Sequence, residues 1–261
     1  MGRLVAAAAV VVAGLLLGVG VFAALVGAGL VRNPLAPRLV GDLALARSER
    51  PGLRVLFVGN SLTFVNEMPE LVHDLAAADP GARPLFTVEY AAPNWTLAKA
   101  AGDERLRRLV AELEWDVVVL QENSNVAAMP AVRRTESEPY AAALAARAAS
   151  VGAETVFYMT GVGTSAQSTL ALARENRGTV APVGLAWWES ARRRPGLDLR
   201  GWDGLHPNRA GSYLAACVFY ALLSGRSAEE SAFTAGLPFA DARYLQRLAD
   251  EIVASRDWDP A

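Results

Sequence analysis

The sequence predicts an α/β fold of three layers, in which a central parallel sheet of about five strands lies between helices. Short apolar runs that are rich in β-branched residues and bounded by turns are typical of strands covered on both faces. Segments with apolar residues three and four positions apart, typical of amphipathic helices, separate these runs. Because strands and helices alternate along the chain, we expect a parallel sheet with helices on both of its faces.

An apolar leader precedes this pattern. Leu4 to Val31 carries no charged residue, and at about 1.5 Å per residue a helix of this length crosses a hydrocarbon core of about 30 Å. A cleaved signal peptide usually has a shorter apolar region of about 7–15 residues. We therefore predict that residues 1–32 are an uncleaved transmembrane anchor, with a cleaved signal peptide as the alternative. Residues 33–51 are expected to be a tether, and residues 52–261 suffice for one domain with a full core.

The strands and helices of this domain follow from the residue patterns. Buried strands are expected at residues 53–58, 85–90, 115–120 and 155–159, and a weaker one at 179–183. Helices are expected at residues 67–78, 103–114, 139–151, 169–177, 185–194, 208–223 and 240–254. Asn66 is expected to cap the first of these helices.

The charge and the cysteine content exclude several classes of function. The net charge is −2 and no basic stripe is present, which argues against nucleic acid as a partner. Cys217 is the only cysteine, so an internal disulfide and a cysteine-based metal site are both excluded. The neighbours of Cys217 are apolar, and we expect it to be a small core residue. The sequence shows no metal-ligand spacing, and we expect neither a metal nor a cofactor.

The loops that follow the strands are the places to look for chemistry, because ligands of parallel sheets bind at the carboxyl ends of strands. Residues 59–63, 93–95 and 121–124 follow the first three strands and carry a hydroxyl or amides suited to acyl transfer. Gly59 permits a sharp turn that would leave the backbone N–H of Ser61 free. Taken alone, such a serine more often caps a turn.

Of the two histidines, His206 is the better candidate for a general base. Asp203 lies three residues before it, so a single turn can bring the carboxylate to the imidazole, fix its tautomer and leave the other ring nitrogen facing a nucleophile. Gly204 eases such a turn, and Pro207 suits a helix start. Taken alone, an Asp-x-x-His motif more often forms a satisfied turn on the surface. His73 lies in the first expected helix, and we expect it to be structural or on the surface.

The turn at Ser61 matches neither of two common motifs. The nucleophile elbow Gly-x-Ser-x-Gly needs a second glycine where this chain has Thr63. The dinucleotide fingerprint Gly-x-Gly-x-x-Gly is absent after the first strand.

Four short motifs occur in an informative order. They are Gly59-Asn60-Ser61, Leu120 to Ser124, Asp203 to Pro207, and Gly211 to Ala216. In this order the chain resembles the SGNH/GDSL hydrolase superfamily. It is most similar to a bacterial branch with Gly-Asn-Ser, Leu-Gln-Glu-x-Ser and Asp-Gly-x-His-Pro motifs. The resemblance covers roughly residues 53–225 and implies a flavodoxin-like three-layer fold.

The resemblance also implies a serine esterase with a Ser-His-Asp triad and an acyl-enzyme. Ser61 would attack the ester carbonyl, His206 would accept and return its proton, and Asp203 would orient the imidazole. The oxyanion hole would consist of the Ser61 N–H, the backbone N–H of Asn94 and the side chain of Asn123. Most members of the superfamily have glycine in place of Asn94, but asparagine tolerates the left-handed backbone better than most residues.

The substrate would be a small-molecule or carbohydrate ester, with acetyl groups on polysaccharide preferred because no long apolar lid is visible. A non-catalytic module that binds envelope glycans on the same fold, and an acyltransferase, are the alternatives. Trp187 and Trp188 either belong to the core or line a substrate cleft. The N-terminal helix would make the membrane a partner. The expected location is the cell membrane with the catalytic domain outside the cytoplasm, or secretion if the leader is cleaved.

Overall fold

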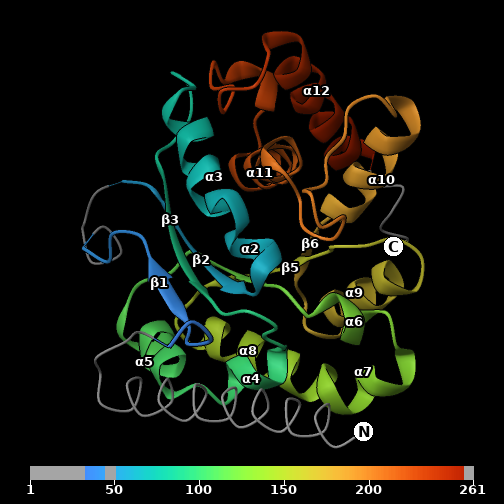
Figure 1. Ribbon diagram of the computed structural model, residues 1–261. Helices are drawn as coiled ribbons and strands as arrows, with labels where there is room; N and C mark the ends of the chain where they lie inside the picture. The colour runs from blue at the N-terminus through green and yellow to red at the C-terminus, as the bar shows by residue number, and fades with distance from the viewer. Residues whose placement is uncertain (1–32, 45–50, 256–261) are drawn as a thin grey trace, which may run out of the picture. The chain divides into compact units, whose positions relative to one another are not determined.

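The computed structural model describes residues 33–44 and 51–255 (Figure 1). The chain divides between Ala36 and Pro37, and the compact unit after this point contains the sheet. The expected anchor at residues 1–32 lies outside the described residues and stays a prediction. Among the described residues, no helix is long and apolar enough to cross a membrane.

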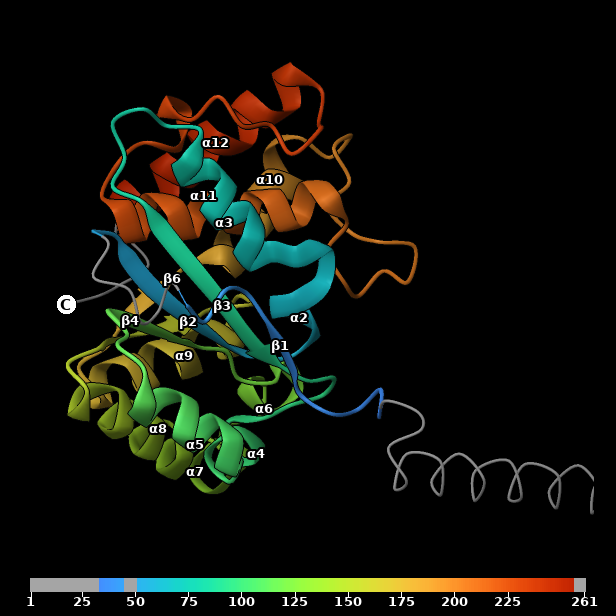
Figure 2. The ribbon, with the colours of Figure 1, turned by 90° about the vertical axis from the view of Figure 1, so that its left-hand side faces the viewer.

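A six-stranded, mostly parallel sheet forms the centre of this unit (Figures 1 and 2). In the order in which they lie across the sheet, the strands are β1 (Arg38–Val40), β3 (Leu85–Ala91), β2 (Leu53–Gly59), β4 (Val117–Leu120), β5 (Glu154–Tyr158) and β6 (Thr179–Ala181). Strands β2 to β6 are parallel, which confirms the five strands predicted from the sequence, and β1 pairs with β3 in the antiparallel direction.

Strand β1 is the one that the sequence pattern does not predict. It lies within the stretch expected to be a tether and pairs with Glu89 to Ala91 of β3. Its three residues are too few to show the alternation from which a half-buried strand is recognised. The compact unit therefore begins at Pro37 rather than at residue 52.

Helices cover both faces of the sheet. They are α2 (Ser61–Phe64), α3 (Met68–Ala77), α4 (Leu97–Ala101), α5 (Glu104–Glu112), α6 (Ser124–Ala127), α7 (Pro130–Glu136), α8 (Glu138–Ser150), α9 (Thr164–Glu175), α10 (Val183–Arg193), α11 (Arg209–Ser224) and α12 (Phe239–Ser255), with 3₁₀ turns η2 (Val65–Glu67) and η3 (Ala228–Glu230). Helices α3, α10, α11 and α12 lie on one side of the sheet, and α4, α5, α8 and α9 lie on the other (Figure 2).

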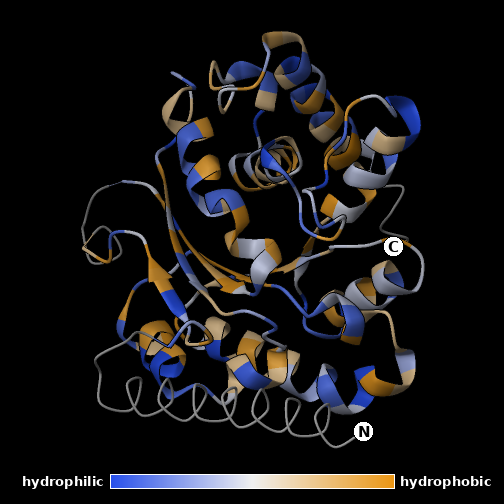
Figure 3. Ribbon diagram, in the orientation of Figure 1, coloured by the Kyte–Doolittle hydropathy of each residue, from blue (hydrophilic) through white to orange (hydrophobic). Residues whose placement is uncertain are grey.

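The two faces of β2 show why the buried part of this strand is apolar. Val55 and Phe57 pack into the core on the α11 side, while Leu56 and Val58 pack into the core on the α8 side. Because successive side chains of a strand point to opposite faces, a strand between two helical layers buries side chains on both of its faces. In Figure 3 the central strands are accordingly largely hydrophobic, while the helices carry both hydrophobic and hydrophilic residues.

All seven predicted helices are present with shifted ends, and the short helices α2, α4, α6 and α7 were not predicted.

The expected cap at Asn66 is wrong. Asn66 has a left-handed backbone with φ of 56°, and Glu67 rather than Asn66 occupies the N-cap position of α3. The Asn66 side chain instead donates to the carbonyl oxygen of Pro207 and to Ser212, at 3.0 and 2.9 Å. This asparagine thus ties the segment after Ser61 to the segment after His206.

An ion pair between the buried carboxylate of Asp79 and the partly exposed Arg226 joins the segments that follow α3 and α11. Asp79 accepts hydrogen bonds from Arg226 at 2.6 and 3.0 Å and from the hydroxyl of Tyr220 at 2.5 Å. Its side chain is only 1% exposed. These bonds, that of Arg226 first, lower the pKa of Asp79 to about 2.

We expect Asp79→Ala to lower the free energy of unfolding by about 3 kcal/mol, because Arg226 and Tyr220 lose their buried partner. Since the pKa is lowered in the folded state, the carboxylate stabilises the fold above its ordinary pKa, and this contribution falls as the pH approaches 2. Urea unfolding at pH 7 and pH 3 measures both effects. Asp74→Ala, at a position of α3 without a side-chain hydrogen bond in the described part of the chain, is the control; an equal loss there would contradict the assignment.

Candidate active site

Ser61 is the first residue of α2 and comes shortly after β2, at the carboxyl end of the sheet. The side chain of Asn60 caps this short helix by accepting from the N–H of Leu62 at 3.2 Å. The N–H groups of Thr63 and Phe64 both bond to the carbonyl oxygen of Asn60. No such bond is formed by the N–H of Ser61 within the described residues, so this donor is free at the start of the helix.

Gln121, at the end of β4, clamps the turn that carries Ser61. Its side-chain oxygen accepts from the backbone N–H of Asn60 and from the hydroxyl of Thr63, both at 2.9 Å, and its amide donates back to Asn60. Gly59 lies in the middle of this network. A Cβ atom there would stand 2.3 Å from the Thr63 hydroxyl and 2.6 Å from the Gln121 oxygen. A larger residue at position 59 would therefore displace the side chains of Thr63 and Gln121 from this network.

The structure brings Ser61, His206 and Asp203 together. The Nε2 atom of His206 lies 2.8 Å from Oγ of Ser61, and Nδ1 lies 2.6 Å from Oδ2 of Asp203. An ionised carboxylate can only accept, so Nδ1 carries the proton and Nε2 of the neutral ring is an acceptor facing the serine hydroxyl. This geometry orders the three groups for transfer of the serine proton to the imidazole.

A tight loop fixes Asp203 relative to His206. The second carboxylate oxygen, Oδ1, accepts from the backbone N–H groups of Leu205 and His206 at 2.9 and 3.0 Å. Gly204 has φ of 68°, the left-handed conformation that this turn requires. The hydrogen bond from His206, followed by those from the backbone, lowers the pKa of Asp203 to about 2. The carboxylate therefore stays ionised at any ordinary pH.

The start of α11 locks this loop in place. Asn208 caps the helix by accepting from the N–H of Gly211, and its own N–H bonds to the carbonyl oxygen of Leu199. A Cβ atom on Gly211 would lie 2.2 Å from that same carbonyl oxygen, so only glycine fits there. Ser212 donates to the carbonyl oxygen of Val65 at 3.2 Å. The Gly-Ser motif of this helix thus fastens the loop that carries His206 to the segment after Ser61.

Asn94 and Asn123, the expected oxyanion donors, lie on the two loops that flank Ser61, after β3 and β4. Asn94 is exposed and has φ of 56°, the left-handed backbone expected for a residue in the place of glycine. The side-chain oxygen of Asn123 caps α6 by accepting from Asn125 at 3.0 Å, and this cap does not use its Nδ2 amino group. Neither asparagine bonds to Ser61 or His206 within the described residues.

Glu122 is a residue of this region whose role the sequence did not reveal. It is 7% exposed, and burial raises the pKa of its carboxyl group. It accepts from the backbone N–H groups of Leu97 and Asn123 at 3.2 and 2.6 Å and from the Ser137 hydroxyl at 2.6 Å. The carboxyl group therefore joins the loops of Asn94 and Asn123. The available signal in the sequence was a charged residue two positions after the last residue of the apolar strand β4.

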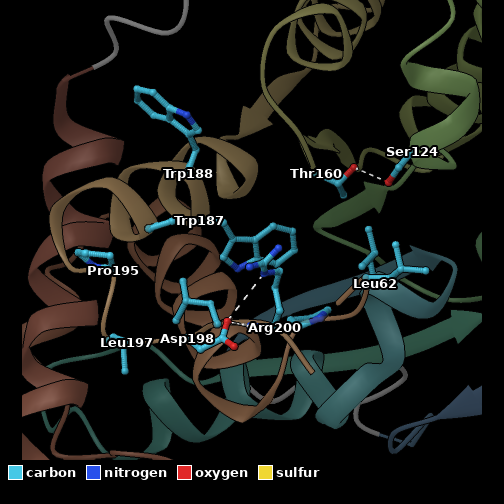
Figure 4. A pocket seen from close by; sticks show the side chains of 13 residues that line it. Leu62, Ser124, Thr160, Trp187, Trp188, Pro195, Leu197, Asp198 and Arg200 are labelled. Atoms are coloured by element: carbon cyan, nitrogen blue, oxygen red, sulfur yellow. Dashed lines mark hydrogen bonds and ion pairs between the residues drawn. The ribbon is translucent and has the colours of Figure 1, made fainter. Parts of the chain in front are cut away.

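A pocket of about 630 Å³ opens beside these groups (Figure 4). Leu62 borders it next to Ser61, and Leu205 and Pro207 border it on either side of His206. Trp187 and Trp188 of α10 also line it. Trp187 packs against the core at the same time, so both interpretations hold for this residue, whereas Trp188 is exposed and belongs to the cleft alone.

The remaining residues singled out from the sequence lie away from this pocket. His73 bonds through Nδ1 to the carbonyl oxygen of Leu85, at the opposite end of β3 from the site, and has a structural role. Cys217 is fully buried in α11, and burial raises the pKa of its thiol. Within the described residues, no group of three His, Cys, Asp or Glu side chains could hold a metal ion.

Comparison with protein-family models and with curated proteins finds no match. Solved structures are similar in fold. A DUF4886 family protein from Bacteroides uniformis matches with a TM-score of 0.65 and 15% identity over 79% of this chain and 96% of its own. A protein from Slackia heliotrinireducens assigned to the SGNH hydrolases has a TM-score of 0.53 and 26% identity over 66% of this chain and 99% of its own. A candidate GDSL-like lipase from Parabacteroides merdae has a TM-score of 0.50 and 13% identity over 68% and 98%. The chain has the α/β fold of the SGNH hydrolases.

Proposed function

We propose that the chain is a serine ester hydrolase in which Ser61, His206 and Asp203 act as the catalytic triad. The observation that carries the proposal is the continuous hydrogen-bonded series from Ser61 Oγ through both ring nitrogens of His206 to Asp203. Nothing else in the described residues combines a nucleophile, a base and an orienting carboxylate at the carboxyl end of the sheet. The fold shared with SGNH hydrolases supports the same reaction class.

The reaction follows from the positions of the protons. Oγ of Ser61 attacks the ester carbonyl carbon while Nε2 of His206 takes the hydroxyl proton, and Asp203 stabilises the resulting imidazolium. The tetrahedral intermediate collapses when Nε2 returns the proton to the leaving alcohol, which leaves an acyl group on Ser61. A water molecule, deprotonated by His206, then attacks the acyl-enzyme and releases the acid and the free serine.

The negative charge of the tetrahedral oxygen needs preorganised donors. The unused N–H of Ser61 is one, and we assign the backbone N–H of Asn94 and the Nδ2 group of Asn123 as the others. The loops of both asparagines are held by Glu122, which fixes their backbones before substrate arrives. Such preorganisation is the usual source of the largest catalytic effect in acyl transfer.

A fluorophosphonate probe tests the proposal, because it reacts only with a serine that a base activates. We expect the full-length chain to be labelled at Ser61, as located by mass spectrometry of its peptides. We expect His206→Ala to slow labelling by at least about 100-fold, since the general base is lost. An unlabelled wild-type chain would contradict the proposal and favour the non-catalytic glycan-binding module.

A further inference from the structure

The position and the lining residues of the pocket beside Ser61 indicate which part of an ester substrate it holds. We infer that the pocket holds the alcohol part of the ester rather than the acyl chain, and that this alcohol is a sugar. The inference rests on the proposed hydrolase function, because only an ester bond placed at Ser61 divides the substrate into these two parts.

The position of His206 decides which half of the ester enters. The imidazole must return its proton to the leaving oxygen, so this oxygen must lie within hydrogen-bond reach of Nε2. The pocket wall includes Leu205 and Pro207, the two residues that flank His206. The assigned oxyanion donors Asn94 and Asn123 do not line it, and the loop after β4 contributes only Ser124 to the wall. The leaving alcohol thus faces the pocket, while the carbonyl oxygen points toward the loops after β3 and β4.

The aromatic part of the wall suits a ring with apolar faces. Trp187 donates from its indole N–H to the carbonyl oxygen of Gly211 at 2.8 Å, which fixes the orientation of its ring. Trp188 is 49% exposed, with the Arg192 guanidinium 6.0 Å from the centre of its ring. Flat aromatic surfaces of this kind pack against the C–H faces of pyranose rings as well as against alkyl chains.

The polar part of the pocket wall favours a pyranose ring over an alkyl chain. Ser124 and Thr160 share a hydrogen bond of 3.1 Å on one side of the pocket, and Asp198 and Arg200 form an ion pair of 3.8 Å on another (Figure 4). An alkyl chain has no donor or acceptor to offer these groups. The hydroxyl groups of a sugar would bond to them. A few polar groups among apolar walls, in about 630 Å³, is the usual composition of a small-molecule site.

Filling the pocket tests the inference. Ala191 lines it from α10 with an exposed methyl group, and Ala191→Trp would occupy the space without touching the triad. Two series of esters separate the two halves of the substrate. In the first the acyl group is always acetyl and the alcohol is ethanol or a methyl pyranoside. In the second the alcohol is always ethanol and the acyl group is acetyl, butyryl or octanoyl.

We expect the Ala191→Trp substitution in the full-length chain to lower kcat/KM for the acetylated methyl pyranoside about tenfold or more. The three ethyl esters should lose much less, and by the same factor whatever the length of the acyl group. Ala146→Trp, the same substitution on the exposed face of α8, is the control and should change neither series. If Ala191→Trp fails to fold, Arg200→Ala in the wall of the pocket replaces it, and should raise KM for the pyranoside ester without lowering kcat.

Three results would overturn the inference. A loss that grows with acyl length among the ethyl esters would assign the pocket to the acyl chain. An equal loss for ethyl acetate and the pyranoside acetate would mean that the pocket does not discriminate by alcohol. A wild-type chain that is labelled at Ser61 but prefers ethyl acetate to the pyranoside acetate would exclude a sugar while leaving the hydrolase function intact. Absence of labelling at Ser61 would instead be the failure of the function itself.

Discussion

Replacing Ser61 with alanine is expected to lower kcat for p-nitrophenyl acetate by about 10⁴- to 10⁶-fold, the range seen when the nucleophile of a triad is removed. The change removes one hydroxyl whose hydrogen bond within the described residues is to His206. The cap from Asn60 and the clamp from Gln121 act on other atoms of the turn. The loss should therefore appear in kcat and not in the stability of the fold.

Initial rates and a thermal unfolding curve on the same preparation separate these effects. Ser150→Ala, at the exposed end of α8, is the matched control, since in the part of the chain that the structure describes its hydroxyl bonds only to a backbone carbonyl of its own helix. Full activity of purified Ser61→Ala would contradict the assignment of the nucleophile. Equal rates for hydrolysis and for transfer to an added alcohol in the wild type would favour the acyltransferase alternative instead.

Strands β2 to β6 could be predicted because their central residues are buried between two layers of helices and are therefore mostly apolar. The clearest case is β4, where three consecutive valines are all buried. The proximity of Asp203 to His206 could also be predicted, because a three-residue turn limits their separation. The proximity of either to Ser61 could not be worked out from spacing, since 145 positions separate Ser61 from His206. For that contact the order of the motifs was the useful signal.

The residues that hold the site could not be predicted for a different reason. Glu122 and Gln121 act through backbone groups of other segments, and a backbone N–H has no sequence signature. Asparagine is a residue type that often caps helices, but Asn66 has a left-handed backbone and does not cap α3. Its partners near His206 exist only after the chain has folded. The pocket could not be predicted either, because its wall is formed by α10 and the loop after it, which meet the segments of Ser61 and His206 only in the folded chain.

The amide variant Asp203→Asn is expected to lower kcat by about 10⁴-fold, although it changes the volume of the side chain hardly at all. The reason is the pair of backbone N–H groups that bond to Oδ1. In the variant they hold the amide oxygen in that place, because an amide nitrogen cannot accept from them. The amide NH₂ then points at Nδ1 of His206. Nδ1 must become the acceptor, the proton moves to Nε2, and the imidazole can no longer take the proton of Ser61.

The pH dependence of the variant distinguishes this account from a general loss of structure. Hydroxide can deprotonate Ser61 without the imidazole, so the residual rate of Asp203→Asn should rise steadily with pH while that of the wild type levels off. In the wild type the carboxylate stays ionised above a pKa of about 2 and imposes no limit of its own. Asp74→Asn on α3 is the control for the amide substitution. If Asp203→Asn kept the wild-type rate and pH profile, the carboxylate would have no part in setting the tautomer, and the base would be activated by another group.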